Sequence, residues 1–233
     1  MWIPGVRIES ASFSLTQPAL LNAVTTAVAQ GRQQDVVALV LSRPFQRGEA
    51  AYASDLPGGP WEAFAPDVWT SRPGRSLPTP TRPVDPSVRP AQVSAAGGEN
   101  HAGQQAAGIS AARQVAERAY VPASSYPVGA VLEIEDGPFL PGVNVEHPDW
   151  TRILCAERNA VGTAYAYGQP DVRRLFLSCL NDPEGTPCGA CRQVLAELTP
   201  EATLWMDRHS DAPQRTTASA LLPGSFRGRA LLS

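Results

Sequence analysis

Two short cysteine-containing motifs carry residue types that can bind a metal ion. The first reads Cys155-Ala156-Glu157-Arg158 and the second reads Pro187-Cys188-Gly189-Ala190-Cys191-Arg192. Thiolates are good zinc ligands, and a catalytic zinc keeps three protein ligands while its fourth position stays open to water. Both motifs are expected at helix starts, where the helix dipole helps a thiolate to form. We therefore predict that Cys155, Cys188 and Cys191 bind one zinc ion.

A carboxylate lies two residues after the first cysteine. Glu157 would stand beside the open position of the metal without being a ligand, and there it could take a proton from water and deliver it to a substrate. Zinc deaminases combine three ligands with such a non-ligand glutamate. Three thiolates leave a negative zinc centre, so we expect Arg158 and the two helix N-termini to offset that charge.

A closed structural zinc site with a fourth protein ligand is the alternative. Cys179 could supply the fourth thiol, although a lone cysteine in an apolar strand is more often a small core residue. The three histidines, His101, His147 and His209, are scattered and form no ligand pair with the cysteines. The open, catalytic site is the favoured interpretation.

The elements around the motifs predict helices that cover a mixed sheet, an α/β fold. Apolar spacing favours helices over residues 106–120, 155–167 and the stretch that follows Cys188. Strands are expected over 128–135, 139–145, 174–180 and 202–206, with a tight turn at Asp136-Gly137 between the first two. Together these elements define a domain over about residues 105–233, which is long enough to fold as one unit.

The part of the chain before this domain has a different composition. Residues 57–98 contain nine prolines and five glycines, which disfavour helices and central strands, so we expect a linker over 57–104. Residues 1–56 are expected to form a small segment of unknown role, with a helix over 18–30 and a buried strand over 35–41. So short a segment buries little surface by itself and should pack on the rest of the chain or on another subunit. A fragment starting near Gly103 is expected to stay soluble and active.

Composition excludes several classes of function. All 19 basic residues are arginines, so lysine Schiff-base chemistry and a P-loop lysine are excluded. The net charge of −3 argues against a broad nucleic-acid surface. No apolar run reaches the ~18 residues of a membrane span, and the N-terminus lacks a signal-peptide pattern, so a cytoplasmic location is expected. Four cysteines in 233 residues do not indicate a disulfide scaffold.

Residues 105–233 resemble the cytidine deaminase family, in its short, three-cysteine, homotetrameric zinc form. The resemblance starts with Ala119-Tyr120-Val121-Pro122 and Tyr126-Pro127-Val128-Gly129-Ala130 and continues with Gly142-Val143-Asn144-Val145-Glu146, both cysteine motifs and Leu221-Leu222-Pro223-Gly224-Ser225-Phe226. These pieces occur in the family's order and with family-like gaps. The region before residue 105 has no counterpart that we recognise.

The resemblance implies a fold and a set of roles. The fold would be a three-layer α/β/α sandwich around a mixed five-stranded sheet. Each subunit would hold one Zn²⁺ through the three cysteines, with Glu157 as the proton shuttle. Asn144 and Glu146 would hold the ribose hydroxyls, and Tyr126 and Ala156 would also contact the substrate. Phe226 would reach the site of a neighbouring subunit and stack on the base bound there.

The implied reaction is hydrolysis of a C–N bond in a cyclic amidine. A free pyrimidine nucleoside, cytidine or deoxycytidine, would be converted into uridine or deoxyuridine and ammonia, as in pyrimidine salvage. The chain departs from the family at Ala123 and in the stretch His147-Pro148-Asp149-Trp150, which leaves the substrate range and subunit packing open. Three alternatives remain: a blasticidin S-type deaminase, an enzyme that edits RNA or DNA, and a non-catalytic zinc protein.

Overall fold

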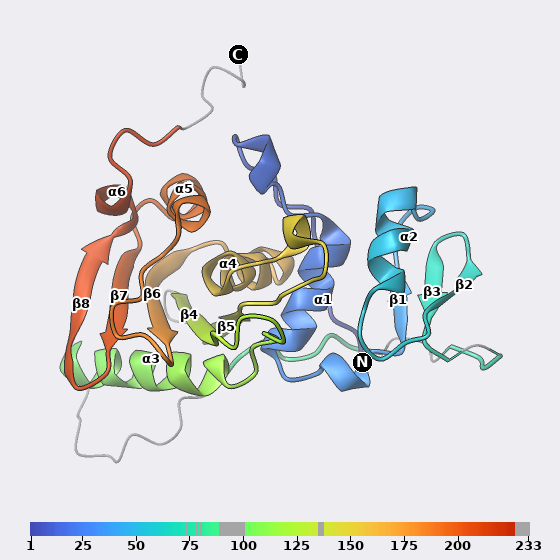
Figure 1. The fold of residues 1–233 in the computed structure, drawn as a ribbon, viewed down its shortest axis with the longest axis horizontal. Helices are drawn as coiled ribbons and strands as arrows, with labels where there is room; N and C mark the ends of the chain where they lie inside the picture. Colours follow the sequence, from blue (N-terminus) through green and yellow to red (C-terminus); the bar gives the residue numbers. More distant parts are fainter. Residues whose placement is uncertain (73, 78, 80, 89–100, 135–137, 227–233) are drawn as a thin grey trace.

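A five-stranded mixed sheet forms the middle layer of the larger part of the molecule (Figure 1). The computed structural model describes residues 1–233 except 73, 78, 80, 89–100, 135–137 and 227–233. The strand order is β5-β4-β6-β7-β8, and only the β6–β7 pair is parallel. The strands are β4 (Val128–Ile134), β5 (Phe139–Val143), β6 (Val172–Cys179), β7 (Thr203–Arg208) and β8 (Asp211–Thr217).

Helices cover both faces of this sheet, which confirms the expected α/β/α sandwich (Figure 1). Helix α3 (His101–Ala116) packs on one face, with Ile109 and Val115 in the same buried cluster as Val131 and Phe176. The opposite face carries α4 (Ala156–Ala166), α5 (Gly189–Leu198) and the short α6 (Ala218–Leu221). Leu175, Phe176 and Leu177 of β6 are all buried, because helices cover both faces of the sheet at this strand.

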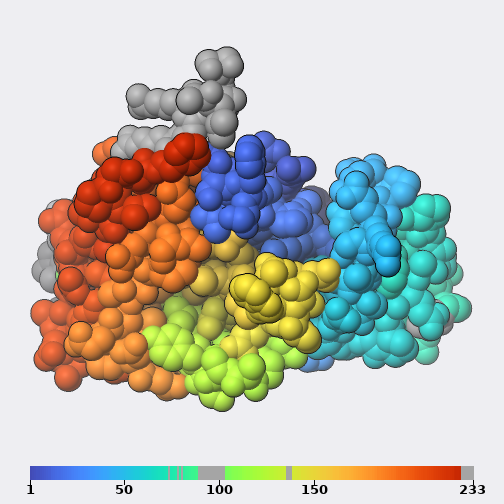
Figure 2. Space-filling view, turned by 45° about the horizontal axis from the view of Figure 1, so that its top comes forward, coloured from blue at the N-terminus to red at the C-terminus, as the bar shows by residue number. Residues whose placement is uncertain are grey.

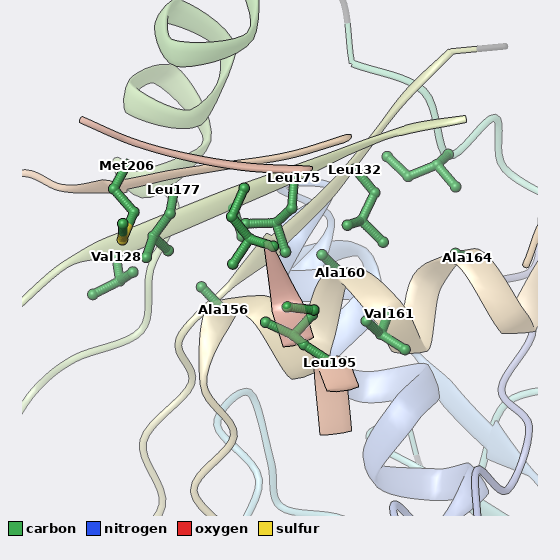
Figure 3. Packing of buried hydrophobic residues seen from close by; sticks show 14 of the residues in the cluster. Val128, Leu132, Ala156, Ala160, Val161, Ala164, Leu175, Leu177, Leu195 and Met206 are labelled. Carbon is green, nitrogen blue, oxygen red and sulfur yellow. The ribbon is translucent and has the colours of Figure 1, made fainter. Parts of the chain in front are cut away.

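The packing of α4 on the sheet fixes the start of that helix. Leu175 and Leu177 of β6 join Ala160 of α4 and Leu195 of α5 in one buried cluster (Figure 3). Gly142 on β5 makes the close approach possible, because a Cβ atom there would lie 2.2 Å from the carbonyl oxygen of Ala156. The first turn of α4 therefore sits directly against the backbone of the sheet.

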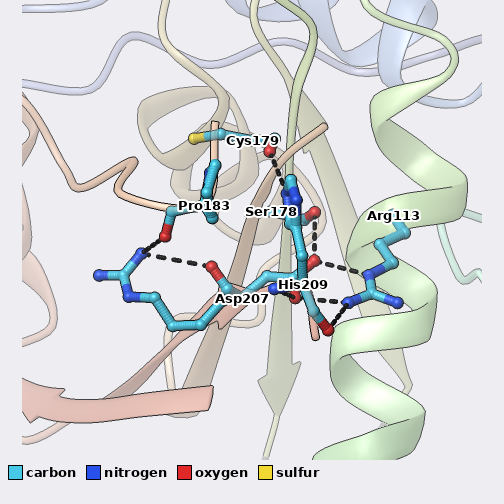
Figure 4. Close-up of polar contacts among 7 residues, drawn as sticks. Arg113, Ser178, Cys179, Pro183, Asp207 and His209 are labelled. Atoms are coloured by element: carbon cyan, nitrogen blue, oxygen red, sulfur yellow. Dashed lines mark hydrogen bonds and ion pairs between the residues drawn. The ribbon is translucent and has the colours of Figure 1, made fainter. Parts of the chain in front are cut away.

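An ion pair ties the opposite helix to the sheet. Arg113 of α3 donates two hydrogen bonds of 2.6 Å to Asp207 on β7, whose side chain is almost fully buried (Figure 4). Asp207 also accepts from the Ser178 hydroxyl at 2.8 Å and from the backbone N–H of His209 at 2.9 Å. A buried carboxylate with this many donors is fully satisfied.

The N-terminal part forms a small unit of its own beside the large sheet (Figure 1). Its strands β1 (Ala38–Val40), β2 (Glu62–Ala65) and β3 (Val68–Thr70) form an antiparallel sheet in the order β1-β3-β2. Its helical elements are η1 (Phe13–Leu15), α1 (Ala19–Ala29), η2 (Gln33–Asp35) and α2 (Arg47–Ser54). A small core joins α1, β1 and α2 and contains Leu20, Leu39, Tyr52, Ala53 and Trp61.

Helix α1 joins this unit to the large sheet. Asn22 donates from its side chain to the carbonyl of Gly162 on α4 at 3.0 Å, and Asn159 on α4 donates to the carbonyl of Thr25 at 3.1 Å. Val28 and Ala29 enter the buried cluster beneath α3. The expectation that the N-terminal segment packs on the rest of the chain is confirmed.

Several sequence expectations differ from the structure. The linker predicted over 57–104 contains β2 and β3, because short strands tolerate the flanking prolines, and α3 begins inside it at His101. The buried strand predicted over 35–41 is shorter, and only Leu39 within β1 is buried. Strand β8 and helix α6 were not anticipated, and the turn at Asp136-Gly137 lies outside the described residues. Within the described part of the chain, no helix has the length and apolar character needed to cross a membrane.

Candidate active site

Three cysteines converge where α4 and α5 begin. Cys155 precedes the first residue of α4, Cys188 precedes α5, and Cys191 lies in the first turn of α5. Their sulfur atoms lie within 4.8 Å of one another, and the Sγ atoms of Cys155 and Cys188 are 3.7 Å apart. Tetrahedral zinc with Zn–S bonds of about 2.3 Å requires sulfurs about 3.8 Å apart. The three side chains therefore fit one zinc ion.

The local electrostatics favour a thiolate at Cys188. Hydrogen bonds from the Cys155 and Cys191 thiols lower the pKa of the Cys188 thiol, and the backbone N–H groups of Ala190 and Cys191 act in the same direction. These N–H groups are the unpaired donors of the first turn of α5. The helix start thus supplies positive partial charge to the metal-binding sulfurs.

Glu157 lies against the cysteine cluster and is almost completely buried. Burial raises the pKa of its carboxyl group to about 7, and the nearby Cys191 thiol acts in the opposite direction. A carboxyl group with such a pKa can both accept and donate a proton near neutral pH. Ala156, fully buried beside it, forms the first residue of α4.

Arg158 points toward the N-terminal segment. Its guanidinium donates to the carbonyl oxygen of Leu15 at 2.9 Å. Its positive charge acts on Glu157 and works to lower the pKa of that carboxyl group, against the larger effect of burial. Sequence reasoning placed Arg158 at the metal centre but gave no sign of this contact with residue 15.

Asn144 and Glu146 follow β5, and Val145 between them pairs with Leu154, the residue before Cys155. The Asn144 amide accepts from the backbone N–H of Val128 and donates to the carbonyl of Tyr126, both at 2.8 Å. Glu146 accepts from the backbone N–H of Ala123 at 2.7 Å. Both side chains hold the segment that precedes β4.

The charge state of Glu146 follows from these contacts. Burial acts to raise its pKa, but hydrogen bonds from Ser124 and from the backbone N–H of Ala123 outweigh burial and lower the pKa overall. Glu146 is therefore ionised at neutral pH and can accept hydrogen bonds from sugar hydroxyls.

The two aromatic residues of the expected site are partly exposed. Tyr126 is 36% exposed, and its hydroxyl donates to Asp182 at 2.7 Å. Phe226 is 54% exposed, and its carbonyl accepts from the side chain of Gln193 on α5. Sequence reasoning missed Asp182, which lies in the turn after β6 and carries no motif.

Cys179 does not join the metal site. It lies at the end of β6 within the core cluster, and the group of possible ligands among the described residues contains only the other three cysteines. The four-thiol structural site is therefore not formed among the described residues.

Comparison with known proteins agrees with this geometry. A protein-family model described as the cytidine and deoxycytidylate deaminase zinc-binding region matches residues 103–206. The cytidine deaminase of Halalkalibacterium halodurans is 41% identical over 119 residues, which cover 51% of this chain and 90% of that protein. The chain belongs to the cytidine deaminase family. As a member of that family it carries a zinc-binding deaminase domain, and the three-cysteine cluster is consistent with one zinc ion.

Two further relatives support membership of the cytidine deaminase family. The cytidine deaminase of Mycobacterium tuberculosis H37Rv is 43% identical over 118 residues, covering 49% of this chain and 84% of that protein. The crystal structure of cytidine deaminase from Burkholderia pseudomallei matches with a TM-score of 0.50 and 35% identity, covering 52% of this chain and 98% of that one. The family resemblance and the expected fold are thus confirmed.

Proposed function

We propose that this protein hydrolyses cytidine and deoxycytidine to uridine and deoxyuridine with release of ammonia. The observation that carries the proposal is the position of Glu157, which is buried in the first turn of α4, two residues after Cys155 of the three-cysteine cluster. Zinc bound by Cys155, Cys188 and Cys191 would activate water for attack on an aminopyrimidine. A purely structural site has no use for a buried carboxyl group at its edge.

Glu157 performs the proton transfers. Its carboxylate takes a proton from the attacking water and delivers it to N3 of the cytosine ring as oxygen adds at C4. It then carries the second proton of the water to the departing amino group, so ammonia leaves and the C4 carbonyl forms. Each turnover therefore consumes one water molecule and releases one ammonia molecule.

The residues around the metal cluster hold the nucleoside. Ionised Glu146 and Asn144 bind the ribose hydroxyls, and both lie in the segment that pairs with residue 154. Tyr126 and Ala156 flank the substrate, and Phe226 stacks on a base. The exposure of Phe226 supports a stacking role across a subunit boundary rather than a place in the core of its own chain.

The negative charge of three thiolates needs compensation. The first turn of α5 supplies it through the backbone N–H groups of Ala190 and Cys191, which help to lower the pKa of the Cys188 thiol. Arg158 contributes its positive charge beside Glu157. This compensation keeps the zinc centre able to activate water.

Residues 105–233 carry this chemistry, and the N-terminal part supports it from outside. We infer a homotetramer with one zinc ion per subunit, acting in the cytoplasm in pyrimidine salvage. Free nucleosides rather than nucleic acid are the substrates, because the chain has a net charge of −3 and no broad basic surface is expected from its composition.

A substrate panel tests this function. The zinc-loaded protein is incubated with cytidine, deoxycytidine, blasticidin S and a single-stranded oligonucleotide, and ammonia release is followed for each. We expect turnover of the first two, loss of activity on chelation, and recovery when zinc is restored. If only blasticidin S or only the oligonucleotide is turned over, that compound is the substrate in place of cytidine. If none of the four compounds is turned over, the proposed deaminase activity is wrong.

A further inference from the structure

One loop leads from the end of β6 to the metal-binding residue Cys188. This loop, residues 180–187, is called the Cys188 loop below. Pro183 and Pro187 have no backbone N–H, so two of its positions cannot donate a backbone hydrogen bond. Its turn is closed by the backbone N–H of Gly185, which donates to the carbonyl of Asp182 at 3.2 Å. A loop outside the sheet ladder depends on side chains for its other hydrogen bonds.

Arg208, the last residue of β7, supplies two of these hydrogen bonds. Its Nη1 atom donates to the carbonyl oxygen of Pro183 at 2.7 Å and to that of Gly185 at 2.9 Å. The contact at Pro183 is drawn in Figure 4. Gln214 on β8 accepts from Nη2 of the same guanidinium at 2.6 Å. Hydrogen bonds from a charged donor are stronger than neutral ones, so Arg208 ties the Cys188 loop firmly to the sheet.

The loop also packs directly on the core at Gly185. This glycine is buried, and a Cβ atom there would lie 2.4 Å from the Sγ atom of Cys179 and 2.7 Å from its Cβ atom. One of the two carbonyl groups that Arg208 binds therefore belongs to the residue at which the loop lies closest to β6. A larger side chain at this position would force the loop outward.

The residue after Arg208 contacts the beginning of the same stretch. The Nε2 atom of His209 lies 3.0 Å from the carbonyl oxygen of Cys179 (Figure 4). His209 has a φ of 56°, in the left-handed region, and Arg113 on α3 donates to its carbonyl oxygen at 3.0 Å. A non-glycine residue keeps such a conformation only where its surroundings hold it. Arg208 thus extends from a turn that is itself fixed in place.

The Cys188 loop serves both parts of the candidate site. Asp182 within it accepts from the Tyr126 hydroxyl at 2.7 Å, and Arg192 on α5 donates to the carbonyl of Pro187 at 2.8 Å, directly before Cys188. On the surface, the orange part of the chain, which includes this loop, borders the red-orange part, which includes β7 and β8 (Figure 2). Contacts behind a metal ligand orient that ligand and tune the affinity for the metal.

We propose that Arg208 is a positioning residue of the metal site. It holds the Cys188 loop against the sheet, so that the Cys188 sulfur stays beside those of Cys155 and Cys191. Arg208 acts through the loop backbone and lies outside both cysteine motifs. The proposal rests on the proposed deaminase function, because it assigns Arg208 to the zinc site of that reaction.

The test compares Arg208→Gln with the wild type in two measurements on the metal. Zinc affinity is measured by competition with a chelating dye, and the geometry of the thiolate ligands is followed by the visible spectrum of the cobalt-substituted protein. We expect about tenfold weaker zinc binding and changed cobalt bands. A residue that only stabilised the fold would lower the unfolding temperature and leave the spectrum of the folded protein unchanged.

Two further substitutions make the comparison specific to the clamp. Arg208→Lys keeps the charge but not the planar pair of donors, so its zinc affinity should fall between those of Arg208→Gln and the wild type. Arg215→Gln is the matched control, because Arg215 is an exposed arginine on β8 whose guanidinium lies over the Trp205 ring. It should change neither the zinc affinity nor the cobalt spectrum.

A different variant covers the case in which Arg208→Gln does not fold. Gly185→Ala pushes the loop away from Cys179 while Arg208 stays in place, and it should also weaken zinc binding about tenfold. Thermal unfolding of the metal-free proteins shows which variants are folded. The proposal is overturned if folded Arg208→Gln, or folded Gly185→Ala in its place, binds zinc as tightly as the wild type and gives the wild-type cobalt spectrum.

Ammonia release from cytidine is measured separately on the zinc-loaded proteins. A wild type that binds zinc but does not turn over cytidine would contradict the proposed function. The zinc affinities and cobalt spectra would still decide whether Arg208 positions Cys188, because neither measurement depends on turnover.

Discussion

The carbonyl oxygen of Leu15 accepts a hydrogen bond from the guanidinium of Arg158, the residue that follows Glu157 in the chain. Five residues earlier, the Ser10 hydroxyl and the backbone N–H of Ala11 donate to Glu197 on α5 at 2.9 and 2.7 Å. The N-terminal segment therefore contacts both helices that begin at the metal-binding cysteines.

This relationship reverses the expectation for a fragment that starts near Gly103. Removing residues 1–102 would strip Val28 and Ala29 from a buried cluster and leave Asn159 without its partner at Thr25. Unpaired buried polar groups and exposed apolar surface both destabilise a fold. We predict that the fragment aggregates or loses activity, as measured by gel filtration and ammonia release. A monodisperse fragment with wild-type activity would show that the contacts are dispensable.

Arg158→Gln tests the link between the N-terminal segment and the site. The substitution removes a charge beside Glu157 and the charge-assisted hydrogen bond to Leu15, so we expect kcat to fall about tenfold while zinc stays bound. Kinetics and metal analysis check both outcomes. The exposed Arg173→Gln is the control. Equal kcat values for Arg158→Gln and Arg173→Gln would show that Arg158 does not contribute to turnover.

Most helices and strands of residues 105–233 could be predicted from the sequence, because local residue patterns determine them. Apolar spacing indicated β4, β6 and α4, and the cysteine spacing indicated the metal cluster. Strand β8 could not be predicted, because it is polar, mostly exposed and contains Pro213. It therefore has no buried face that would produce an alternating apolar pattern.

The N-terminal contacts could not be predicted for a different reason. Asn22 and Asn159 are fully buried, yet polar residues in a helix are ordinarily assigned to its solvent face. Their partners are backbone carbonyls far away in the chain, at Gly162 and Thr25. Such pairing depends on tertiary structure and leaves no local signal.

Substitution of the cysteines should separate metal ligands from core residues. Cys191→Ala removes one of three converging sulfurs, and we expect loss of stoichiometric zinc and of activity. Cys179→Ala is the matched control, because Cys179 lies in the core cluster and its loss should cost only about 1 kcal/mol of stability. Metal analysis after dialysis measures the difference. Zinc loss in Cys179→Ala alone would overturn the ligand assignment.

The Arg113–Asp207 pair predicts a pH dependence of stability. Burial raises the pKa of Asp207, but hydrogen bonds from Arg113, Ser178 and the backbone of His209 outweigh burial and lower the pKa overall. A carboxyl group with a lowered folded-state pKa stabilises the fold above its unfolded pKa of about 3.9, and this stabilisation is lost as pH falls through the folded value.

Asp207→Asn should therefore destabilise the protein by about 2–3 kcal/mol at pH 7, because it leaves Arg113 without its counter-charge. The loss should shrink as pH falls below about 4 and should disappear below the lowered folded-state pKa, where the folded wild type also loses the carboxylate. Urea unfolding at several pH values measures the difference. Asp211→Asn, at an exposed position, should change neither the stability at pH 7 nor its pH dependence. If Asp207→Asn lowers the free energy of unfolding by the same amount at all pH values, the ionised Asp207 carboxylate is not the source of the stabilisation.

If Glu157 carries the protons of a zinc-dependent deamination, its removal should abolish turnover and leave the zinc bound. Ammonia release from cytidine is compared between the zinc-loaded wild type and Glu157→Ala, with zinc content measured on the same samples, and the exposed Glu117→Ala serves as the control. We expect full zinc occupancy in all three proteins, wild-type turnover for Glu117→Ala, and a loss of at least about 10³-fold in kcat for Glu157→Ala. Near-wild-type kcat in zinc-loaded Glu157→Ala would show that Glu157 does not carry the protons.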